Sequence, residues 1–337
     1  MTRSVSLLST LSLLCVLCVP LSLCAREAQA RERRVHTYSI VARDAKTGAL
    51  GVAVHSHWFQ VGRLVAWAEA GVGAIATQAM TNASFGPRGL ALLRRGLSAK
   101  VVLQKLLASD KLRHNRQLAI VDARGGVAAW TGKRCIPDAG HQIGSGFSTQ
   151  ANLMASKRVW PAMARAYRQA RGPLAERLLA ALRAAEKAGG DLRGRQSAAL
   201  LVVPGKRAKI PALAPLVDLR VADHRQPLDE LARLLRIRRA YDAWGRGAAA
   251  LESRKLGRAR RAFAEMNRLL PARQALRFWQ AHALYRAGRV REGIALFRAV
   301  FAKAPRWRRV LPRLVGGKLL SAAQLADIRR RLRGKSK

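Results

Sequence analysis

Four short apolar segments punctuated by glycines lie between residues 36 and 78, and they restrict the fold more than any other feature. They are residues 37–42, 50–55, 64–67 and 72–78, with Gly48, Gly62 and Gly71 close to or between them. Short runs of this kind, rich in Val, Ile and Ala and bounded by glycine, are typical of β-strands. Because the connections are short, we expect neighbouring strands to be antiparallel.

The segments that follow alternate between helical and strand-like patterns. Helical spacing covers residues 90–95 and 99–109, and again 156–169 and 174–188. Strand-like runs occur at 117–122, 127–131 and 197–203. Strands, paired helices and strands again predict an α+β domain in which two sheets form the core and the helices lie outside.

The chain changes character after Pro204 and carries an internal repeat of 34 positions. The repeat relates Gly247 to Ala281, Ala259 to Gly293, Phe263 to Phe297 and Pro271 to Pro305. This period resembles that of tetratricopeptide repeats, which are helix-turn-helix units. We therefore predict an all-α helical-repeat domain over residues 227–337. The alternative is a helical bundle in which the spacing is fortuitous.

Positive charge is spread over the whole chain. The formal net charge is +44, with +19 on residues 1–204 and +25 on residues 205–337. Such an excess favours attraction to polyanions but says nothing about the fold. Aromatic residues make up only 5% of the chain, and no nucleic-acid readout motif is present. We therefore interpret most of the charge as solvated surface, with anionic envelope polymers as candidate partners and nucleic acid disfavoured.

Residues 1–30 have the pattern of an export signal. A basic Arg3 precedes an apolar stretch from Leu7 to Leu23, and Ala28-Gln29-Ala30 provides a small-x-small cleavage site. A retained membrane anchor and a lipoprotein signal at Cys24 are the alternatives. We expect a periplasmic or extracellular protein whose leader, residues 31–36, precedes the first strand, and whose remaining cysteine, Cys135, is a buried structural residue.

The first domain has none of the common metal- or nucleotide-binding motifs, and we predict neither a metal nor a cofactor. Thr37 is notable because it opens the first strand just after the leader. A Thr that becomes the first residue of a chain gains an α-amine with a pKa of about 7.7–8.0, which can act as a general base. From its position alone, an ordinary strand Thr is the simpler interpretation.

Residues 36–235 resemble the bacterial family called domain of unknown function 1028. The likeness rests on blocks in a fixed order, among them residues 36–44, 51–62, 67–79, 147–153 and 190–203. The resemblance implies an N-terminal-nucleophile hydrolase, a four-layer αββα sandwich that cleaves amide bonds through an N-terminal Thr, Ser or Cys. We assign residues 37–226 to this domain, and Thr37 becomes the candidate nucleophile, provided that the bond between His36 and Thr37 is cut.

The other candidate site residues are polar groups at strand ends and in loops. Asn152 is the candidate oxyanion donor, since a side-chain amide donates without carrying charge; the alternative is a loop cap. Carboxylate binding by the loop at 191–197 competes with an Asp–Arg brace of that loop. The candidate substrate-binding residues are His57, Gln78, Arg116, Asp191, Arg193 and Gln196.

Two functions follow from these patterns. The first is an exported amidase- or peptidase-like hydrolase, which acts on a small-molecule or peptide amide while the helical repeats dock a protein partner. The second is a catalytically silent scaffold that serves as an envelope adaptor or polyanion binder through its basic tail. The sequence leaves the oligomeric state open and is compatible with a homo-oligomer.

Overall fold

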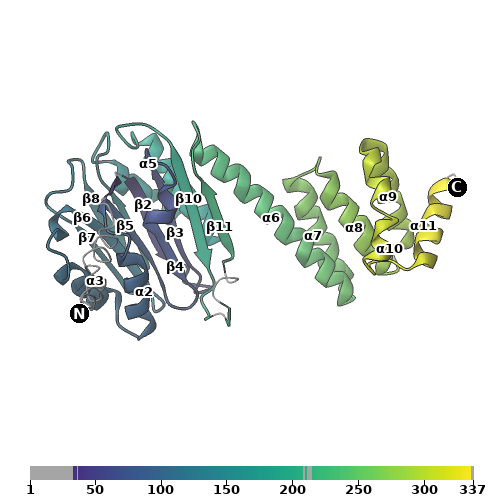
Figure 1. Ribbon diagram of the computed structural model, residues 1–337, viewed down its shortest axis with the longest axis horizontal. Coiled ribbons are helices and arrows are strands. Elements are labelled where there is room, and N and C mark those ends of the chain that lie inside the picture. The colour runs from purple at the N-terminus through teal and green to yellow at the C-terminus, as the bar shows by residue number, and fades with distance from the viewer. Residues whose placement is uncertain (1–32, 36, 208, 211–214, 335–337) are drawn as a thin grey trace, which may run out of the picture.

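The structure is a computed structural model that describes residues 33–35, 37–207, 209–210 and 215–334. It combines two β-sheets flanked by helices with a C-terminal helical region, so the predicted mixed α+β class is confirmed (Figure 1). The predicted export signal lies outside the described residues. Among those that are described, no helix is both long and apolar enough to span a membrane.

Sheet I is centred on strand β5, Gly73–Thr81. Its order is β1-β5-β6-β7, and β4 also pairs with β5. The other four strands are β1 (Arg33–Val35), β4 (Ala66–Glu69), β6 (Arg116–Asp122) and β7 (Val127–Thr131).

Sheet II has the order β11-β10-β3-β2-β9-β8. All the pairings in both sheets are antiparallel in the described part of the chain. The prediction made from the short connections between residues 36 and 78 is confirmed for β2–β3 and for β4–β5. The six strands are β2 (Thr37–Arg43), β3 (Leu50–Ser56), β8 (Gly140–Gly144), β9 (Phe147–Ala151), β10 (Ser197–Val203) and β11 (Val217–Val221).

Three apolar clusters hold these layers together. One lies between the sheets and includes Val41, Val54 and Ala76. Another joins sheet II to helices α4 (Val159–Gln169) and α5 (Leu174–Lys187). A third joins sheet I to helices α2 (Phe85–Arg94) and α3 (Ala99–Ala108). Each strand of the core therefore buries one face against the opposite sheet and the other against helices.

The C-terminal region consists of helix pairs that extend away from the sheets (Figure 1). Helix α6, Pro227–Glu252, packs its first turns on the core of sheet II through Leu228, Leu231 and Leu235, and then contacts α7. Gly247 lies against the ring of Phe263, where a Cβ would come within 2.5 Å of the ring. This close approach explains why a small residue occurs there.

The helices that follow α6 repeat with the spacing seen in the sequence. Helices α7 (Leu256–Leu269) and α9 (Val290–Lys303) begin 34 residues apart. Helix α6 packs against α7 and α8 packs against α9, and these are the two most extensive helix–helix contacts of the region. The remaining helices of the region are α8 (Gln274–Arg286), α10 (Arg313–Gly316) and α11 (Ala322–Arg333).

Several of the predicted elements differ from the structure. Thr37 does not open the first strand, because residues 33–35 of the predicted leader form β1 and pair with β5. The predicted strand at 64–67 is split, because α1 (Val61–Val65) ends there before β4 begins; Val61 and Val65, four residues apart, are both buried. Helix α2 begins at Phe85, five residues earlier than predicted. Gly86 and Pro87 obscured its first turn, where Pro is tolerated because the N–H group it lacks has no helical partner.

Candidate active site

The space between the sheets is apolar over much of its area and polar at one end. The polar end is built by strand residues, or residues directly after a strand, that are fully buried and carry no charge. They are Thr37, Ser39, Gln78, Gln117, Ser148, Gln150 and Asn152. Buried polar groups are costly unless they are hydrogen-bonded, and the contacts below show how these groups are satisfied.

Thr37 lies at the start of β2, opposite Ser56 of β3. Its carbonyl oxygen accepts hydrogen bonds from Gln78 Nε2 at 3.1 Å and from the backbone N–H of Asn152 at 3.1 Å. Asn152 Nδ2 also donates to this oxygen, at 3.4 Å. Thus the structure brings together Thr37, Gln78 and Asn152, three of the predicted site residues, and fixes the backbone of Thr37 from two sides.

Gln117 links the two side chains that hold Thr37. Its Oε1 accepts from Gln78 Nε2 at 2.7 Å and from Asn152 Nδ2 at 2.9 Å. Its Nε2 donates to the carbonyl of Ala151 and to Thr131 Oγ1, both at 2.9 Å. Gln117 therefore orients both amides that contact Thr37. In the sequence it stands out only as a polar residue at a strand end, like Gln78 and Arg116.

Ser39 and Gln150 extend the network along sheet II. Gln150 Nε2 donates to Ser39 Oγ at 2.6 Å, and Ser39 Oγ donates to Gln78 Oε1 at 2.5 Å. Ser148 Oγ donates to Gln150 Oε1 at 3.0 Å. A continuous chain of hydrogen bonds between uncharged amides and hydroxyls thus surrounds Thr37. It reaches a titratable group at His141, whose Nδ1 lies 2.8 Å from Thr131 Oγ1.

The chain crosses from one sheet to the other immediately before Thr37. Strand β1 pairs with β5 in sheet I, with Val35 opposite Ala79, whereas β2 belongs to sheet II. The peptide bond that precedes Thr37 is therefore in the crossing segment; His36 itself lies outside the described residues. This crossing occurs at the polar end of the inter-sheet space.

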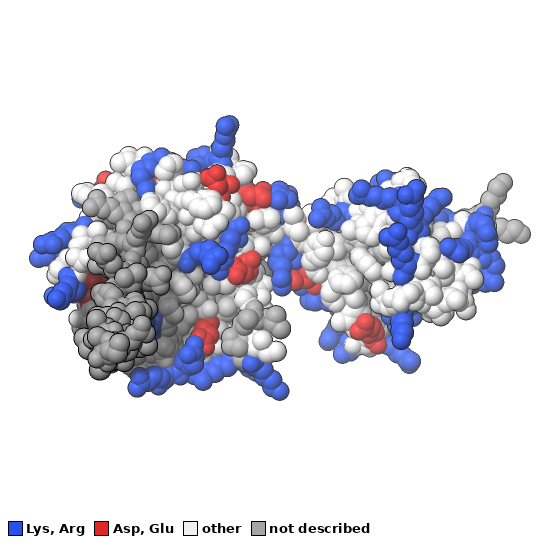
Figure 2. All heavy atoms as spheres, viewed as in Figure 1, with Lys and Arg blue, Asp and Glu red and all other residues white. Residues whose placement is uncertain are grey.

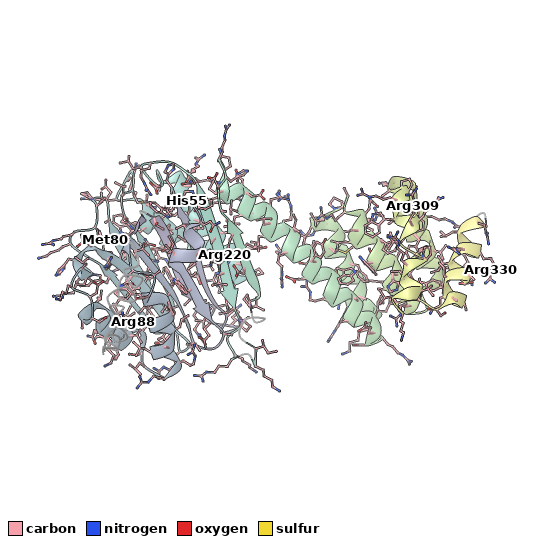
Figure 3. The ribbon with its side chains drawn as sticks, viewed as in Figure 1. His55, Met80, Arg88, Arg220, Arg309 and Arg330 are labelled. Atoms are coloured by element: carbon pink, nitrogen blue, oxygen red, sulfur yellow. The ribbon has the colours of Figure 1, made fainter. Side chains whose placement is uncertain are left out.

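Arg116, predicted to bind substrate, is buried beside this network and is bound to other protein groups. Its Nε lies 2.7 Å from Asp110 Oδ2, and its Nη1 donates to the carbonyl oxygen of Met80. These contacts show a brace between β5, β6 and the segment before β6. Figure 3 labels Met80, the β5 residue whose carbonyl Arg116 holds.

The four remaining predicted residues lie in or beside the loop before β10. The buried Asp191 carboxylate accepts from the backbone N–H of His57 at 3.1 Å and from Arg193 Nη2 at 2.8 Å. The carbonyl of Gln196 accepts from the N–H of His224 at 2.8 Å. The register Thr37–Ser56–Ser197 across β2, β3 and β10 places this loop at the same end of sheet II as Thr37. Asp191 and Arg193 form an internal pair here.

His55 is a buried group to which the sequence did not point. Its ring stacks on Tyr38 with centroids 4.7 Å apart, and neither ring nitrogen has a hydrogen-bond partner among the described residues. Figure 3 labels it near the end of sheet II where α5 lies. Burial lowers the pKa of the His55 imidazole to about 4. No signal in a single sequence shows that this His is buried.

The low pKa of His55 predicts a pH-dependent stability. In the unfolded chain the pKa returns to about 6.5, so the unfolded state binds the proton first and stability is lost as the pH falls from about 6.5 towards 4. We expect wild type to lose about 2 kcal/mol more than His55→Phe between pH 7 and pH 5, measured by urea unfolding. Phe keeps a ring on Tyr38 but does not titrate.

The matched control for this prediction is His57→Gln, because His57 is an exposed histidine only two positions along the chain. This variant should keep the pH dependence of wild type. Identical pH profiles for wild type and His55→Phe would contradict the prediction.

Cys135 and metal binding contribute little to the picture of the site. Cys135 is half-buried, and burial raises the pKa of its thiol to about 11, so it is protonated at neutral pH and a poor nucleophile. Within the described residues, no group of three or more His, Cys, Asp or Glu side chains is arranged to hold a metal ion.

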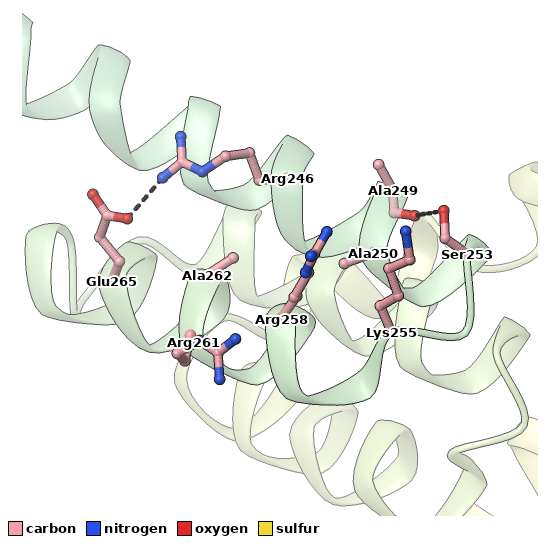
Figure 4. A pocket seen from close by; sticks show the side chains of 9 residues that line it. All are labelled: Arg246, Ala249, Ala250, Ser253, Lys255, Arg258, Arg261, Ala262 and Glu265. Atoms are coloured by element: carbon pink, nitrogen blue, oxygen red, sulfur yellow. Dashed lines mark hydrogen bonds and ion pairs between the residues drawn. The ribbon is translucent and has the colours of Figure 1, made fainter. Parts of the chain in front are cut away.

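A concave feature lies in the helical region, between α6 and α7. It is a groove of about 480 Å³ whose lining includes Arg246, Lys255, Arg258 and Arg261 (Figure 4). Arg246 pairs with Glu265 at 2.7 Å, whereas the other three cations form no ion pair within the described part of the chain. Figure 2 shows Lys and Arg over both parts of the molecule, so this groove is one basic area among several.

Comparison with known proteins identifies the family to which the sheet domain belongs. Residues 37–231 match the family of unknown function DUF1028. A crystal structure of a Silicibacter pomeroyi protein of that family is 33% identical and has a TM-score of 0.54. The match covers 59% of this chain and 84% of that one. A search of curated proteins gave no match. The resemblance carried by the sequence blocks is therefore confirmed, and the chain belongs to the DUF1028 family.

Proposed function

We propose that the protein is an exported amide-bond hydrolase that uses Thr37 as an N-terminal nucleophile once residues 31–36 have been removed. In this proposal the two sheets and their outer helices are the αββα sandwich of the N-terminal-nucleophile hydrolases. The export signal predicted at residues 1–30 would deliver the chain to the periplasm or to the outside of the cell.

The observation that supports this proposal most strongly is the setting of Thr37. Its carbonyl is held by Gln78 and Asn152, neither of which is a group able to take a proton near neutral pH. Among the described residues, the titratable His141 joins this network only through Thr131 Oγ1, which Gln117 contacts. A hydroxyl nucleophile needs such a group within reach. The α-amine that cleavage would create on Thr37 would supply such a base on the nucleophilic residue itself.

The chemistry then follows from the residues around Thr37. The Thr37 hydroxyl adds to the substrate carbonyl, its proton passes to the α-amine and on to the leaving amine, and the C–N bond breaks to leave an ester. Water hydrolyses this ester and restores Thr37. Gln78 and Asn152 position the backbone of the nucleophile. Asn152 is also the candidate donor to the oxyanion, a role in which its Nδ2 would give up the longer of its two hydrogen bonds among the described residues, that to the Thr37 carbonyl at 3.4 Å.

The first test is the N-terminus of the protein. A purified chain starting at Arg31 should convert on incubation to one that begins Thr-Tyr-Ser, as followed by intact mass and N-terminal sequencing. The Thr37→Ala version of the same chain should not convert, because self-cleavage needs the hydroxyl. A chain that still starts at Arg31 would rule out self-activation, and failure to convert in the exporting cell as well would rule out the proposed function.

The basic groove supports a second candidate function, that of a silent scaffold whose tail binds anionic polymers. Its helix pairs, 34 residues apart, are also consistent with tetratricopeptide-like units that dock a protein. Exposed cations on one groove attract a polyanion by releasing its counterions, so the binding should weaken with salt.

Charge reversal tests this second function. We expect Arg258→Glu combined with Arg261→Glu to weaken binding to inorganic polyphosphate by about tenfold at low salt, measured by fluorescence anisotropy. The control is Arg306→Glu combined with Arg309→Glu, which makes the same charge change at exposed positions outside the groove. Equal loss in the two double variants would show that only net charge matters and would exclude a dedicated groove.

A further inference from the structure

Strand β5 has one edge that is completed by two different strands, β4 and β1. Along this edge β4 covers Gly73–Ala76 and β1 covers Ala79–Thr81, whereas the opposite edge pairs with β6 from Gly73 to Ala79. The register of β1 is Arg33 opposite Thr81, Arg34 opposite Met80 and Val35 opposite Ala79. Sheet I is therefore complete at its Thr81 end only while β1 is present.

Strand β1 belongs to the leader that the proposed function removes, and the inference rests on that function. Cutting before Thr37 separates residues 33–35 from the domain by a break in the chain. The N–H and C=O groups of Ala79–Thr81 that β1 satisfies then need another partner. The edge thus opened begins next to Gln78, the residue whose amide contacts Thr37.

The segment of β5 that β1 covers, Ala79–Thr81, is held in place by groups outside the leader. Arg116 donates to the carbonyl of Met80 and is itself paired with Asp110. Thr81 Oγ1 donates to the carbonyl of Ala79 at 3.3 Å, and Ala79 has a left-handed φ of +68°. We therefore expect this edge to keep its shape when β1 leaves, as a pre-organised site does.

We infer that the substrate is a peptide whose residues before the cut bond add to β5 as an antiparallel strand on Ala79–Thr81, in the place that β1 occupies in this structure. Because β1 runs towards Thr37, a peptide in the same direction would present its next carbonyl to the nucleophile. Removal of the leader and cleavage of substrate then use the same subsites. Main-chain pairing of this kind selects extended peptides over compact amides.

The test uses the leader itself as the probe. A peptide of residues 31–36 with a free carboxylate, Arg-Glu-Arg-Arg-Val-His, is titrated into a chain that starts at position 37 and carries Thr37→Ala. We expect saturable binding by fluorescence anisotropy, with slower amide hydrogen exchange concentrated at Ala79–Thr81. The matched control is the chain from Arg31 with the same substitution, whose tethered β1 should weaken peptide binding at least about tenfold.

Backbone methylation of the peptide separates strand pairing from attraction between charges. Since alternate residues of an antiparallel strand donate to their partner, single N-methylation at Arg33, Arg34 and Val35 should weaken binding in an alternating pattern. Equal affinity for all three methylated peptides, or protection elsewhere than Ala79–Thr81, would overturn the inference.

The binding experiment tests this inference separately from the proposed function, because the Thr37→Ala chain can bind the peptide without catalysing any reaction. Binding with alternation in a protein that hydrolyses nothing would leave the peptide site standing and refute the hydrolase. If the protein hydrolyses amides but the peptide does not slow hydrogen exchange at the β5 edge, the hydrolase would stand and the peptide site would be refuted.

Discussion

Thr37→Ala, in a chain that starts at position 37, should lower amide hydrolysis by at least about a thousandfold. Removing a nucleophile eliminates the covalent route, and what remains is the weak help of binding and oxyanion donors. Thr37→Ser should keep part of the activity, since it retains a hydroxyl on the residue that carries the α-amine. Initial rates on peptide amides of defined sequence provide the measurement.

The control for this prediction is Thr77→Ala, which removes another fully buried Thr hydroxyl from β5. Thr77 Oγ1 donates to the carbonyl of Asn82 and is not part of the network around Thr37. Both alanine variants should unfold within about 1–2 kcal/mol of wild type. Activity that survives Thr37→Ala in a correctly folded chain would place the nucleophile on another residue.

The strands could be predicted wherever apolar residues dominate both of their faces, as in β3, β5, β6 and β10. Strand β9 could not, because Ser148 and Gln150 face the opposite sheet where the pattern calls for apolar residues, and Asn152 follows them. On β9, therefore, the polar residues that help to build the candidate site also conceal the strand that carries them. The pattern of hydrophobic residues is least informative where polar groups replace the core.

The sequence predicted which residues belong to the site better than it predicted the hydrogen bonds between them. Thr37, Gln78 and Asn152 were chosen from the sequence, and they meet in the structure although they are 41 to 115 positions apart. For Asp191 and Arg193 the sequence left carboxylate binding and a loop brace open, and in the structure the two side chains are paired at 2.8 Å. The role of Gln117 and the burial of His55 depend on how the strands pair and how the two sheets face each other. This arrangement cannot be read from one sequence.

Gln117→Met should destabilise the protein by about 3–5 kcal/mol, the largest loss we expect from a single uncharged substitution in the site. Met has nearly the length and volume of Gln, so no sizeable cavity forms. It would, however, deprive Gln78 Nε2 and Asn152 Nδ2 of an acceptor and the carbonyl of Ala151 of a donor, all in buried positions. Each buried group without a partner costs about 1–3 kcal/mol.

Urea unfolding followed by far-UV circular dichroism measures this loss, with Gln104→Met on the exposed face of α3 as the control. That variant should lie within about 0.5 kcal/mol of wild type, because its amide faces water. Equal stabilities for the two variants would mean that the network is not needed to hold the sheets together. A loss confined to Gln117→Met would show that the uncharged groups around Thr37 stabilise the fold, through the same hydrogen bonds that hold the Thr37 carbonyl in place.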